Sequence, residues 1–263
     1  MKRYAVLALI LSLAGCQITP YLGAAREFRT VNTSAYELSI SKSGRMSLSL
    51  PSGAVVLTNA YPAMSAEQDQ RPKPINIPGV FSTRTMGKTK LGEGHGILLK
   101  KGDYRWLLQT YTTEPFLTVQ VTYTNTSKKT VKVRMLSPLC AQLPLLLATN
   151  SAETPVQDTS NPDVPIPDKY ALIQDSQTGS FLLAAFLTRN TSLTKISVEH
   201  SQNTRRPVSE ILAADVYDPP AEVPPGGSLT SDLLYLAVGE NDPTEAALRF
   251  KAAAEKFYTD ATR

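Results

Sequence analysis

The segment GDYRWLLQTYTTEPFLTVQVTYTNT, residues 102–126, contains the most regular pattern in the chain. Gly102-Asp103 is a hairpin-turn signal, and Glu114-Pro115 interrupts the apolar run that follows. From Leu117 to Tyr123 every second residue is apolar, and Thr or Gln stands between them. An apolar residue at every second position places one face of a strand in the core. This segment therefore predicts an antiparallel meander with one buried face.

The same period-two pattern extends over most of the chain. Two alternating runs over residues 38–50 are separated by Ser43-Gly44 and predict a further hairpin. The continuous apolar run Phe181–Phe186 predicts a strand that is covered on both faces. We therefore expect a mainly β fold over residues 35–240, a large antiparallel β-sandwich of the supersandwich kind.

Proline and polar residues interrupt these strands in two places. A short strand is expected over residues 55–57, and the Pro-rich residues 62–79 then predict a long loop. Residues 149–168 are rich in Pro, Asp, Ser and Thr, and predict a second long loop.

The period changes at the C-terminus. Asp242 is placed to cap a helix, Pro243 suits the first helical position, and an acidic residue follows in the first turn. Apolar residues then recur at helical spacing from Ala246 to Phe257. This predicts one C-terminal α-helix from about Pro243 to Thr259, within a final segment of residues 241–263.

Composition excludes several classes of function. The chain has 263 residues, with 27 Lys and Arg against 23 Asp and Glu, and the basic residues form no stripe. Nucleic acid is therefore a poor candidate partner. With two Cys and two His, the chain offers neither a disulfide framework nor a four-Cys zinc site. Phosphate-loop, dinucleotide and nucleophile-elbow motifs are also missing, so no cofactor, metal or catalytic residue is assigned.

The N-terminus has the layout of an export signal. A basic start at Lys2-Arg3 precedes an apolar run too short to span a bilayer, and together they predict a signal peptide over residues 1–15. Leu-Ala-Gly before Cys16 resembles the bacterial lipoprotein cleavage box, which implies lipid attachment to Cys16. Gln17 implies, by the same resemblance, an outer-membrane location. Residues 16–34 are polar and are expected to form a tether. Without residues 1–15 the chain has 25 basic and 23 acidic residues, so charge should contribute little to membrane contact and the lipid would anchor the chain.

A family resemblance is carried by residues 102–126, by GSFLLAAFLT at 179–188 and by the ending LAVGENDPTEAALRFKAAAEKF. These segments resemble the N-terminal β-sandwich of glycoside hydrolase family 36, which comprises α-galactosidases and raffinose-synthase relatives. In that family a (β/α)₈ barrel follows the sandwich and carries both catalytic Asp residues. The sequence ends at Arg263, where the barrel would begin, so the resemblance implies no catalytic residue here and no activity for this chain alone.

Four residues are candidates for carbohydrate contact. Tyr104 and Trp106 share one face of a strand and would form a stacking platform for a sugar, whereas Tyr111 lies on the other face. Glu93 and His95 stand among three Gly, in a stretch whose backbone can approach a ligand closely. The alternative is that Trp106 belongs to the core and that Glu93 and His95 lie in a flexible hairpin loop.

Two further features have a structural alternative. Asp163 and Asp168 are the closest carboxyl pair within a loop, but turn formation beside Pro explains them equally. Cys140 lies among Leu residues, which predicts a buried, inert thiol. Lipid on Cys16 would leave Cys140 without a disulfide partner.

Three hypotheses about function follow. The first is a non-catalytic, lipid-anchored module that binds glycans or packs against a separate catalytic barrel chain. The second is a truncated or split α-galactosidase, for which this chain supplies the scaffold. The third is a structural lipoprotein of the cell envelope.

Overall fold

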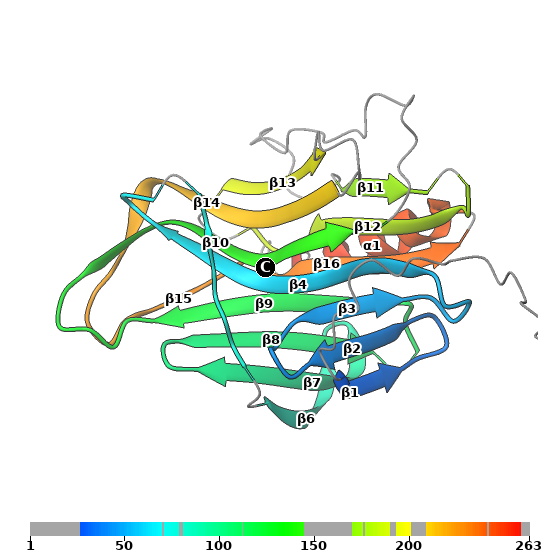
Figure 1. Cartoon of the computed structure of the whole chain (residues 1–263), viewed down its shortest axis with the longest axis horizontal. Helices are drawn as coiled ribbons and strands as arrows, with labels where there is room; N and C mark the ends of the chain where they lie inside the picture. Colours follow the sequence, from blue (N-terminus) through cyan, green and yellow to red (C-terminus); the bar gives the residue numbers. More distant parts are fainter. Residues whose placement is uncertain are drawn as a thin grey trace, which may run out of the picture.

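The computed structural model describes residues 27–69, 71–78, 81–111, 113–144, 170–175, 177–189, 193–200, 209–240 and 242–258. Within them, two antiparallel β-sheets stack face to face and one α-helix lies outside the sandwich (Figure 1). This confirms the mainly β sandwich with a single C-terminal helix.

The first sheet has the strand order β1-β2-β3-β4-β10-β14-β13, with β5 paired to β4. Its strands are β1 (Glu27–Asn32), β2 (Glu37–Ser41), β3 (Met46–Ser49), β4 (Val55–Ala66), β5 (Lys73–Pro74), β10 (Val131–Leu143), β13 (Leu193–His200) and β14 (Ser209–Val223). The hairpin predicted over residues 38–50 is present as β2 and β3.

The second sheet has the strand order β11-β12-β16-β9-β8-β7-β6, with β15 paired to β9. Its strands are β6 (Phe81–Thr89), β7 (Gly92–Lys101), β8 (Tyr104–Tyr111), β9 (Phe116–Thr124), β11 (Ala171–Gln174), β12 (Ser180–Phe186), β15 (Ser228–Thr230) and β16 (Leu234–Glu240). The predicted meander is present as β7, β8 and β9, with Trp106 opposite both Leu99 and Val121.

The main core lies between the two sheets. Alternate residues of β9, from Leu117 to Tyr123, point into it, as their spacing predicts. Leu38 and Leu48 meet them from the first sheet. Tyr36 also crosses the sandwich, because its buried hydroxyl donates to the carbonyl of Phe116 at 3.1 Å.

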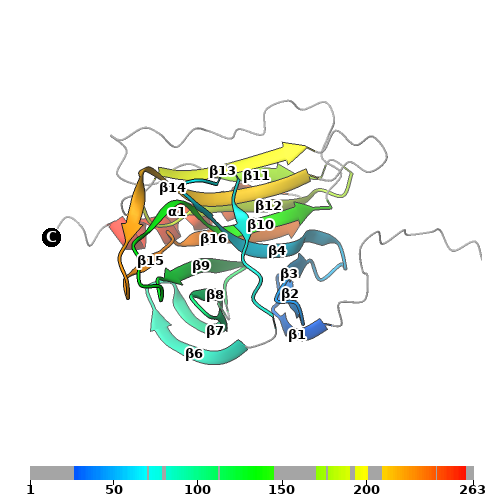
Figure 2. The same ribbon diagram turned by 60° about the vertical axis from the view of Figure 1, so that its left-hand side comes forward.

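A second apolar cluster covers the outer face of the second sheet. Helix α1 (Thr244–Tyr258) packs there against β12 and β16 (Figures 1 and 2). Phe250 and Ala254 of the helix are buried against Phe181, Leu183 and Tyr235. Every residue of β12 is buried, because alternate side chains enter the main core and the helix-covered cluster. The prediction of a strand covered on both faces is confirmed.

The tether expected over residues 16–34 is wrong for its last part, because β1 forms there and pairs with β2. An edge strand is held largely by backbone hydrogen bonds to its one neighbour, so its sequence need not show an apolar alternation. In the pairing of β1 with β2, Arg29 lies opposite Ile40 and Val31 lies opposite Leu38.

The loop expected from residue 62 is also wrong at its start, because β4 continues through Pro62 to Ala66. Proline lacks an N–H, and a central strand normally excludes it. Here the pairing of β10 with β4 is irregular between Ser137 and Cys140, opposite Pro62. The carbonyl of Pro62 still accepts the N–H of Ile75 at 2.8 Å. A local irregularity therefore accommodates the proline.

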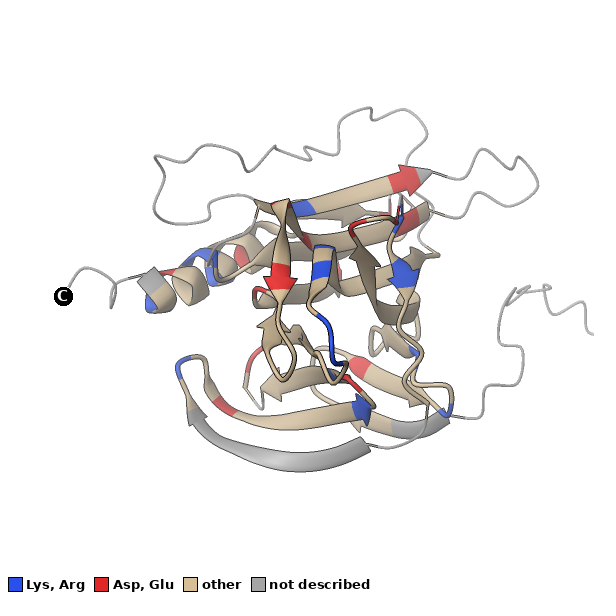
Figure 3. Cartoon of the chain, turned by 90° about the vertical axis from the view of Figure 1, so that its left-hand side faces the viewer, with Lys and Arg blue, Asp and Glu red and all other residues tan. Residues whose placement is uncertain are grey.

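The surface carries both signs of charge. On the face presented in Figure 3, Lys and Arg are interspersed with Asp and Glu along the strands. Among the described residues, no helix is long and apolar enough to cross a membrane.

Candidate functional site

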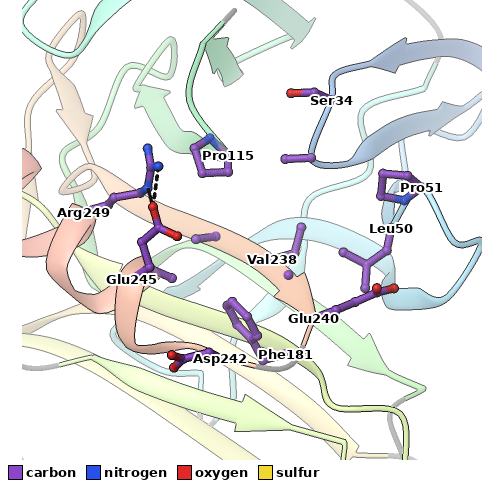
Figure 4. Close-up of a pocket in the computed structure, with 14 residues that line it drawn as sticks. Ser34, Leu50, Pro51, Pro115, Phe181, Val238, Glu240, Asp242, Glu245 and Arg249 are labelled. Atoms are coloured by element: carbon purple, nitrogen blue, oxygen red, sulfur yellow. Dashed lines mark hydrogen bonds and ion pairs between the residues drawn. The ribbon is translucent and has the colours of Figure 1, made fainter.

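A cleft with a volume of about 390 Å³ opens at one end of the sandwich, beside the first turn of α1 (Figure 4). Its walls come from the turn before β2, the turn after β3, the turn before β9, the end of β16 and the helix. The hydrogen bond from Tyr36 to Phe116 joins two of these walls, because Ala35 and Pro115 are the neighbouring residues that line the cleft. The cleft is thus framed by elements that the core holds in place.

The floor of the cleft is apolar. Phe181 of β12 and Val238 of β16 lie there, and Leu50 and Pro51 form part of the rim (Figure 4). The ring of Phe181 rests on Gly239, where a Cβ would lie 2.7 Å from the ring. Glycine at this position therefore leaves room for the aromatic ring directly against the backbone of β16.

Two carboxylates stand where β16 passes into the helix. Glu240 accepts a hydrogen bond from the hydroxyl of Ser52. Asp242 accepts the backbone N–H of Thr244 at 2.8 Å and so caps the helix. Hydrogen bonding by the side chain and backbone of Thr244 lowers the pKa of Asp242. Asp242 is therefore ionised at neutral pH.

Arg249 ties the helix to the second sheet at this cleft. Its Nη2 lies 2.7 Å from Glu245 Oε1, one helical turn earlier, and its Nη1 lies 3.2 Å from Glu114 Oε2. The hydrogen bond that Arg249 donates to the carboxylate of Glu245 is the main cause of the raised pKa of Arg249. The guanidinium of Arg249 thus forms ion pairs with two carboxylates at once.

A buried hydroxyl lies near this ion pair. Tyr235 of β16 is fully buried, with its ring centroid 4.6 Å from that of Phe116 and 5.5 Å from that of Phe250. Its hydroxyl has no hydrogen-bond partner within the described chain. Burial is the main cause of its raised pKa, and Glu114 raises the pKa further.

The chemistry of the cleft suits binding. An apolar floor beneath a few polar groups is the usual composition of a small-molecule site, and the volume falls within the range of about 300–1,000 Å³ for such sites. Within the described ranges, no group of three or more His, Cys, Asp or Glu could hold a metal ion.

The two aromatic residues proposed as a sugar platform lie elsewhere. Trp106 is fully buried in the main core, and its Nε1 donates to the carbonyl of Pro138 at 2.9 Å. A sugar therefore has no access to its ring, and the platform hypothesis is wrong for Trp106. Tyr104 is half-buried, its ring centroid lies 5.3 Å from that of Tyr123, and burial raises its pKa to about 12. Tyr111 lies on the opposite face, as its spacing predicts.

Glu93 and His95 are exposed and lie within β7, outside the cleft lining. The expected flexible loop is wrong here, because strand pairing continues to Gly92, opposite Thr89. Packing explains one of the three glycines. A Cβ at Gly94 would lie 2.7 Å from the carbonyl oxygen of Thr110 and 3.2 Å from the ring of Tyr111.

Cys140 is a buried free thiol, as the surrounding Leu residues predict. Burial raises its pKa to about 11, and Ser137 Oγ lies 3.5 Å from its sulfur. Cys16, Asp163 and Asp168 lie outside the described residues.

The sequence pattern does not indicate the cleft. It predicts Asp242 as a helix cap and an acidic residue, Glu245, in the first turn, and it singles out neither Glu240 nor Arg249. No local signal could have combined them with Phe181, because packing of the helix on the sheet brings these segments together.

The fold and the cleft define a mainly β sandwich protein with a helix-bordered cleft. No protein-family model matches the sequence, and no curated protein matches it. Solved structures do match. A TPR-domain containing protein from Parabacteroides distasonis superposes with a TM-score of 0.58 and 14% identity over 81% of this chain.

Two α-galactosidases share the fold. The enzyme from Lactobacillus brevis has a TM-score of 0.53 and 10% identity over 87% of this chain. A GH36 α-galactosidase from Geobacillus stearothermophilus has a TM-score of 0.50 and 10% identity over 81% of this chain. Our chain spans 47% of the Parabacteroides protein and 41% and 40% of the two enzymes, less than half of each. At these identities the likeness is one of fold, and it agrees with the sandwich implied by the family resemblance.

Proposed function

We propose that this chain is a non-catalytic carbohydrate-binding module, exported and held at the bacterial outer membrane by lipid on Cys16. The cleft beside α1 carries the proposal, because it is a preformed, sugar-sized recess with an apolar floor and a charged rim. The shared fold of α-galactosidases supports the choice of carbohydrate as the ligand class.

The chemistry of a pyranose ring matches this arrangement. Its C–H face packs on apolar surface, and here the exposed Pro51 and the half-buried Ala35 and Pro115 supply that surface. Its hydroxyl groups donate hydrogen bonds to carboxylates, and bonds to an ionised acceptor are stronger than neutral ones. Glu240 and Asp242 supply these acceptors.

Calorimetry on purified residues 17–263 tests the binding, with galactosides and α-glucans as ligands. Ser34 is an exposed cleft residue, so Ser34→Trp should fill the opening and abolish the heat of binding. Ser43→Trp, in the exposed turn between β2 and β3, is the matched control and should bind like the unaltered chain. An absence of heat with every sugar would reject the carbohydrate role.

Membrane fractionation tests the anchor. The unaltered chain, with Cys16 in place, should incorporate labelled fatty acid and sediment with the outer membrane. The Cys16→Ser variant should carry no label. Labelled Cys16→Ser protein would contradict attachment at this residue.

This chain spans only 41% and 40% of the two α-galactosidases. This partial coverage favours one alternative, in which the chain is a scaffold that acts with a catalytic barrel. The intact mass of the native protein, extracted from host membranes, separates the two. A lipidated species near the 28.6 kDa of this chain would support the module, and one about twice as large would support a longer glycosidase.

A further inference from the structure

We propose that the end of the sandwich opposite the cleft rests on an anionic lipid surface, so that the cleft opens away from the membrane. This surface, here called the basic end, consists of five exposed cations on two neighbouring turns: Lys100, Lys101, Arg105, Lys128 and Lys129. The orientation rests on the proposed lipid anchor at Cys16, whereas the attraction of the basic end to lipid does not depend on that anchor.

The basic end is strongly positive, although the chain as a whole is nearly neutral. Residues 100–105 and 125–130 carry these five cations and one acidic residue, Asp103. The carboxylate of Asp103 already accepts a hydrogen bond from the hydroxyl of Thr126 at 2.6 Å. None of the five cations forms an ion pair with another described residue. Their charge is therefore available to a partner.

Backbone and buried hydrogen bonds hold the two turns in place. The N–H of Thr124 donates to the carbonyl of Asp103 at 2.7 Å, which joins one turn to the other. Asn125 is fully buried, and its side-chain amide donates to the carbonyls of Lys129 and Val223, both at 2.8 Å. The backbone of the basic end is thus preformed before any partner binds.

Two of the cations repel each other within the sheet. Lys100 of β7 lies directly opposite Arg105 of β8, and both are exposed. Like charges in directly opposite positions destabilise a sheet. On its other side Arg105 lies opposite Thr122 of β9, which is neutral and offers no compensating charge. An anionic partner relieves this repulsion, and a neutral partner does not.

The basic end and the cleft lie at opposite ends of the same strands. Strand β8 runs from Tyr104, next to the basic turn, to Tyr111, and Pro115 of the cleft lining follows. At about 3.3 Å per residue, the length of β8 separates the two ends by roughly 25 Å. In Figure 1 the turn between β7 and β8 lies on the left and α1 lies on the right.

The N-terminal strand begins on the side of the basic end. Glu27, the first residue of β1, pairs with Ser41. The turn that follows Ser41 lies against the neighbouring hairpin, because a Cβ at Gly44 would be 3.6 Å from Cδ2 of Leu99. Leu99 is the residue before Lys100 of the basic end. The other end of β1 leads into the turn that lines the cleft.

This position favours a lipid surface as the anionic partner. Cys16 is eleven residues before Glu27, so the connection spans at most about 40 Å. A bilayer that holds a lipid on Cys16 is therefore within reach of the basic end. Each Lys or Arg at an anionic bilayer strengthens binding roughly fivefold, so five cations decide which surface of the sandwich turns to the membrane.

Sedimentation with vesicles measures the attraction without the anchor. Residues 17–263 contain every described residue and lack Cys16. We expect this protein to bind vesicles of equal parts phosphatidylglycerol and phosphatidylcholine at least about tenfold more tightly than vesicles of phosphatidylcholine alone. Binding should fall as salt rises from about 0.1 M to about 1 M, where the Debye length decreases from about 10 Å to about 3 Å.

Two pairs of substitutions test the residues. Lys128→Gln with Lys129→Gln removes two cations and keeps the hydrogen bond from Asn125, which the backbone of Lys129 accepts. This variant should bind the anionic vesicles about tenfold more weakly or worse. Lys251→Gln with Lys256→Gln is the matched control, because it removes the same charge from exposed positions on α1. The control should bind like the unaltered chain.

Fluorescence quenching tests the orientation. Thr130 is exposed at the basic end, and Ser34 is exposed in the cleft lining. Thr130→Cys and Ser34→Cys each accept a fluorophore, whereas Cys140 is buried. On anionic vesicles that carry a quencher on the lipid headgroup, the label at position 130 should be quenched more strongly than the label at position 34.

The outcomes separate this inference from the proposed function. Equal binding to neutral and anionic vesicles, or equal losses in the two lysine pairs, would overturn it. Tighter binding of soluble polyphosphate than of anionic vesicles would overturn lipid as the partner, and stronger quenching at position 34 would overturn the orientation. Fatty-acid labelling tests the anchor alone and sugar calorimetry tests the cleft alone, so neither failure would be confused with failure of the basic end.

Discussion

Replacing Phe250 with Ala tests whether α1 is an integral part of the sandwich. Phe250 is 1% exposed, with its ring centroid 5.5 Å from that of Tyr235 and 6.2 Å from that of Tyr170. The substitution removes roughly 100–150 Å² of buried apolar surface, worth about 2.5–4 kcal/mol at about 25 cal/mol per Å². The cavity that remains raises the expected loss in the free energy of unfolding to about 3–5 kcal/mol.

Urea unfolding of residues 17–263 measures this loss, with circular dichroism and Trp106 fluorescence recorded together. The matched control is Leu248→Ala on the same helix, because Leu248 is 64% exposed and should change stability by less than about 0.5 kcal/mol. In a thermal scan the Phe250→Ala melting temperature should fall by about 6–20 °C.

Equal stability of Phe250→Ala and Leu248→Ala would refute the reasoning, because a docked helix must distinguish its buried face from its exposed face. Separate transitions would also refute it. Trp106 lies in the main core, so a helix that unfolds first would change the circular dichroism before the fluorescence.

Three further variants test local features. Gly44→Ala should destabilise the chain by more than about 1 kcal/mol, because φ is +74° there and a Cβ would lie 1.9 Å from the carbonyl oxygen of Ile77. An unchanged midpoint of urea unfolding would contradict this expectation. Trp106→Phe should cost about 1–3 kcal/mol, because the buried carbonyl of Pro138 loses its donor, and thermal unfolding measures the cost. The Cys140 thiol should resist thiol reagents until the chain unfolds. Its pKa is raised from 9.0 to about 11 in the folded state, so the stability from the neutral thiol is full below pH 9 and is lost as pH rises through 11. Cys140→Ala should lose this part of the alkaline decline, and an identical pH profile in both forms would refute the assignment.

Much of the fold could be predicted because its signals are local. The turn at Gly102-Asp103 and the alternation from Leu117 to Tyr123 define a meander, and the structure has it as β8 and β9. The run Phe181–Phe186 predicts burial on both faces, and it is covered by the core and by α1. The helix begins and ends within one residue of the predicted bounds, because its cap and its period both lie within the segment itself.

The errors occur where a distant partner overrides local pattern. Residues 27–32 gain a strand only through pairing with β2, and Pro62 stays within β4 only because the pairing of β10 is irregular opposite it. Trp106 illustrates the same limit at a site. Its position in the strand is compatible with a sugar platform or with a core residue. Its full burial and the hydrogen bond from its Nε1 to the carbonyl of Pro138, in the other sheet, show that it is a core residue.

Residue order alone therefore determined the elements of this protein: a mainly β chain with alternating strands, a continuous buried strand and one capped helix. Period and turn chemistry act between near neighbours, so a single sequence records them. Only the tertiary structure decided which face of the sandwich the helix covers and where the cleft opens. The cleft joins Ser34, Phe181 and Glu240, which are far apart in the chain. Burial of apolar surface brings them together, and this force depends on area removed from water and not on order along the chain.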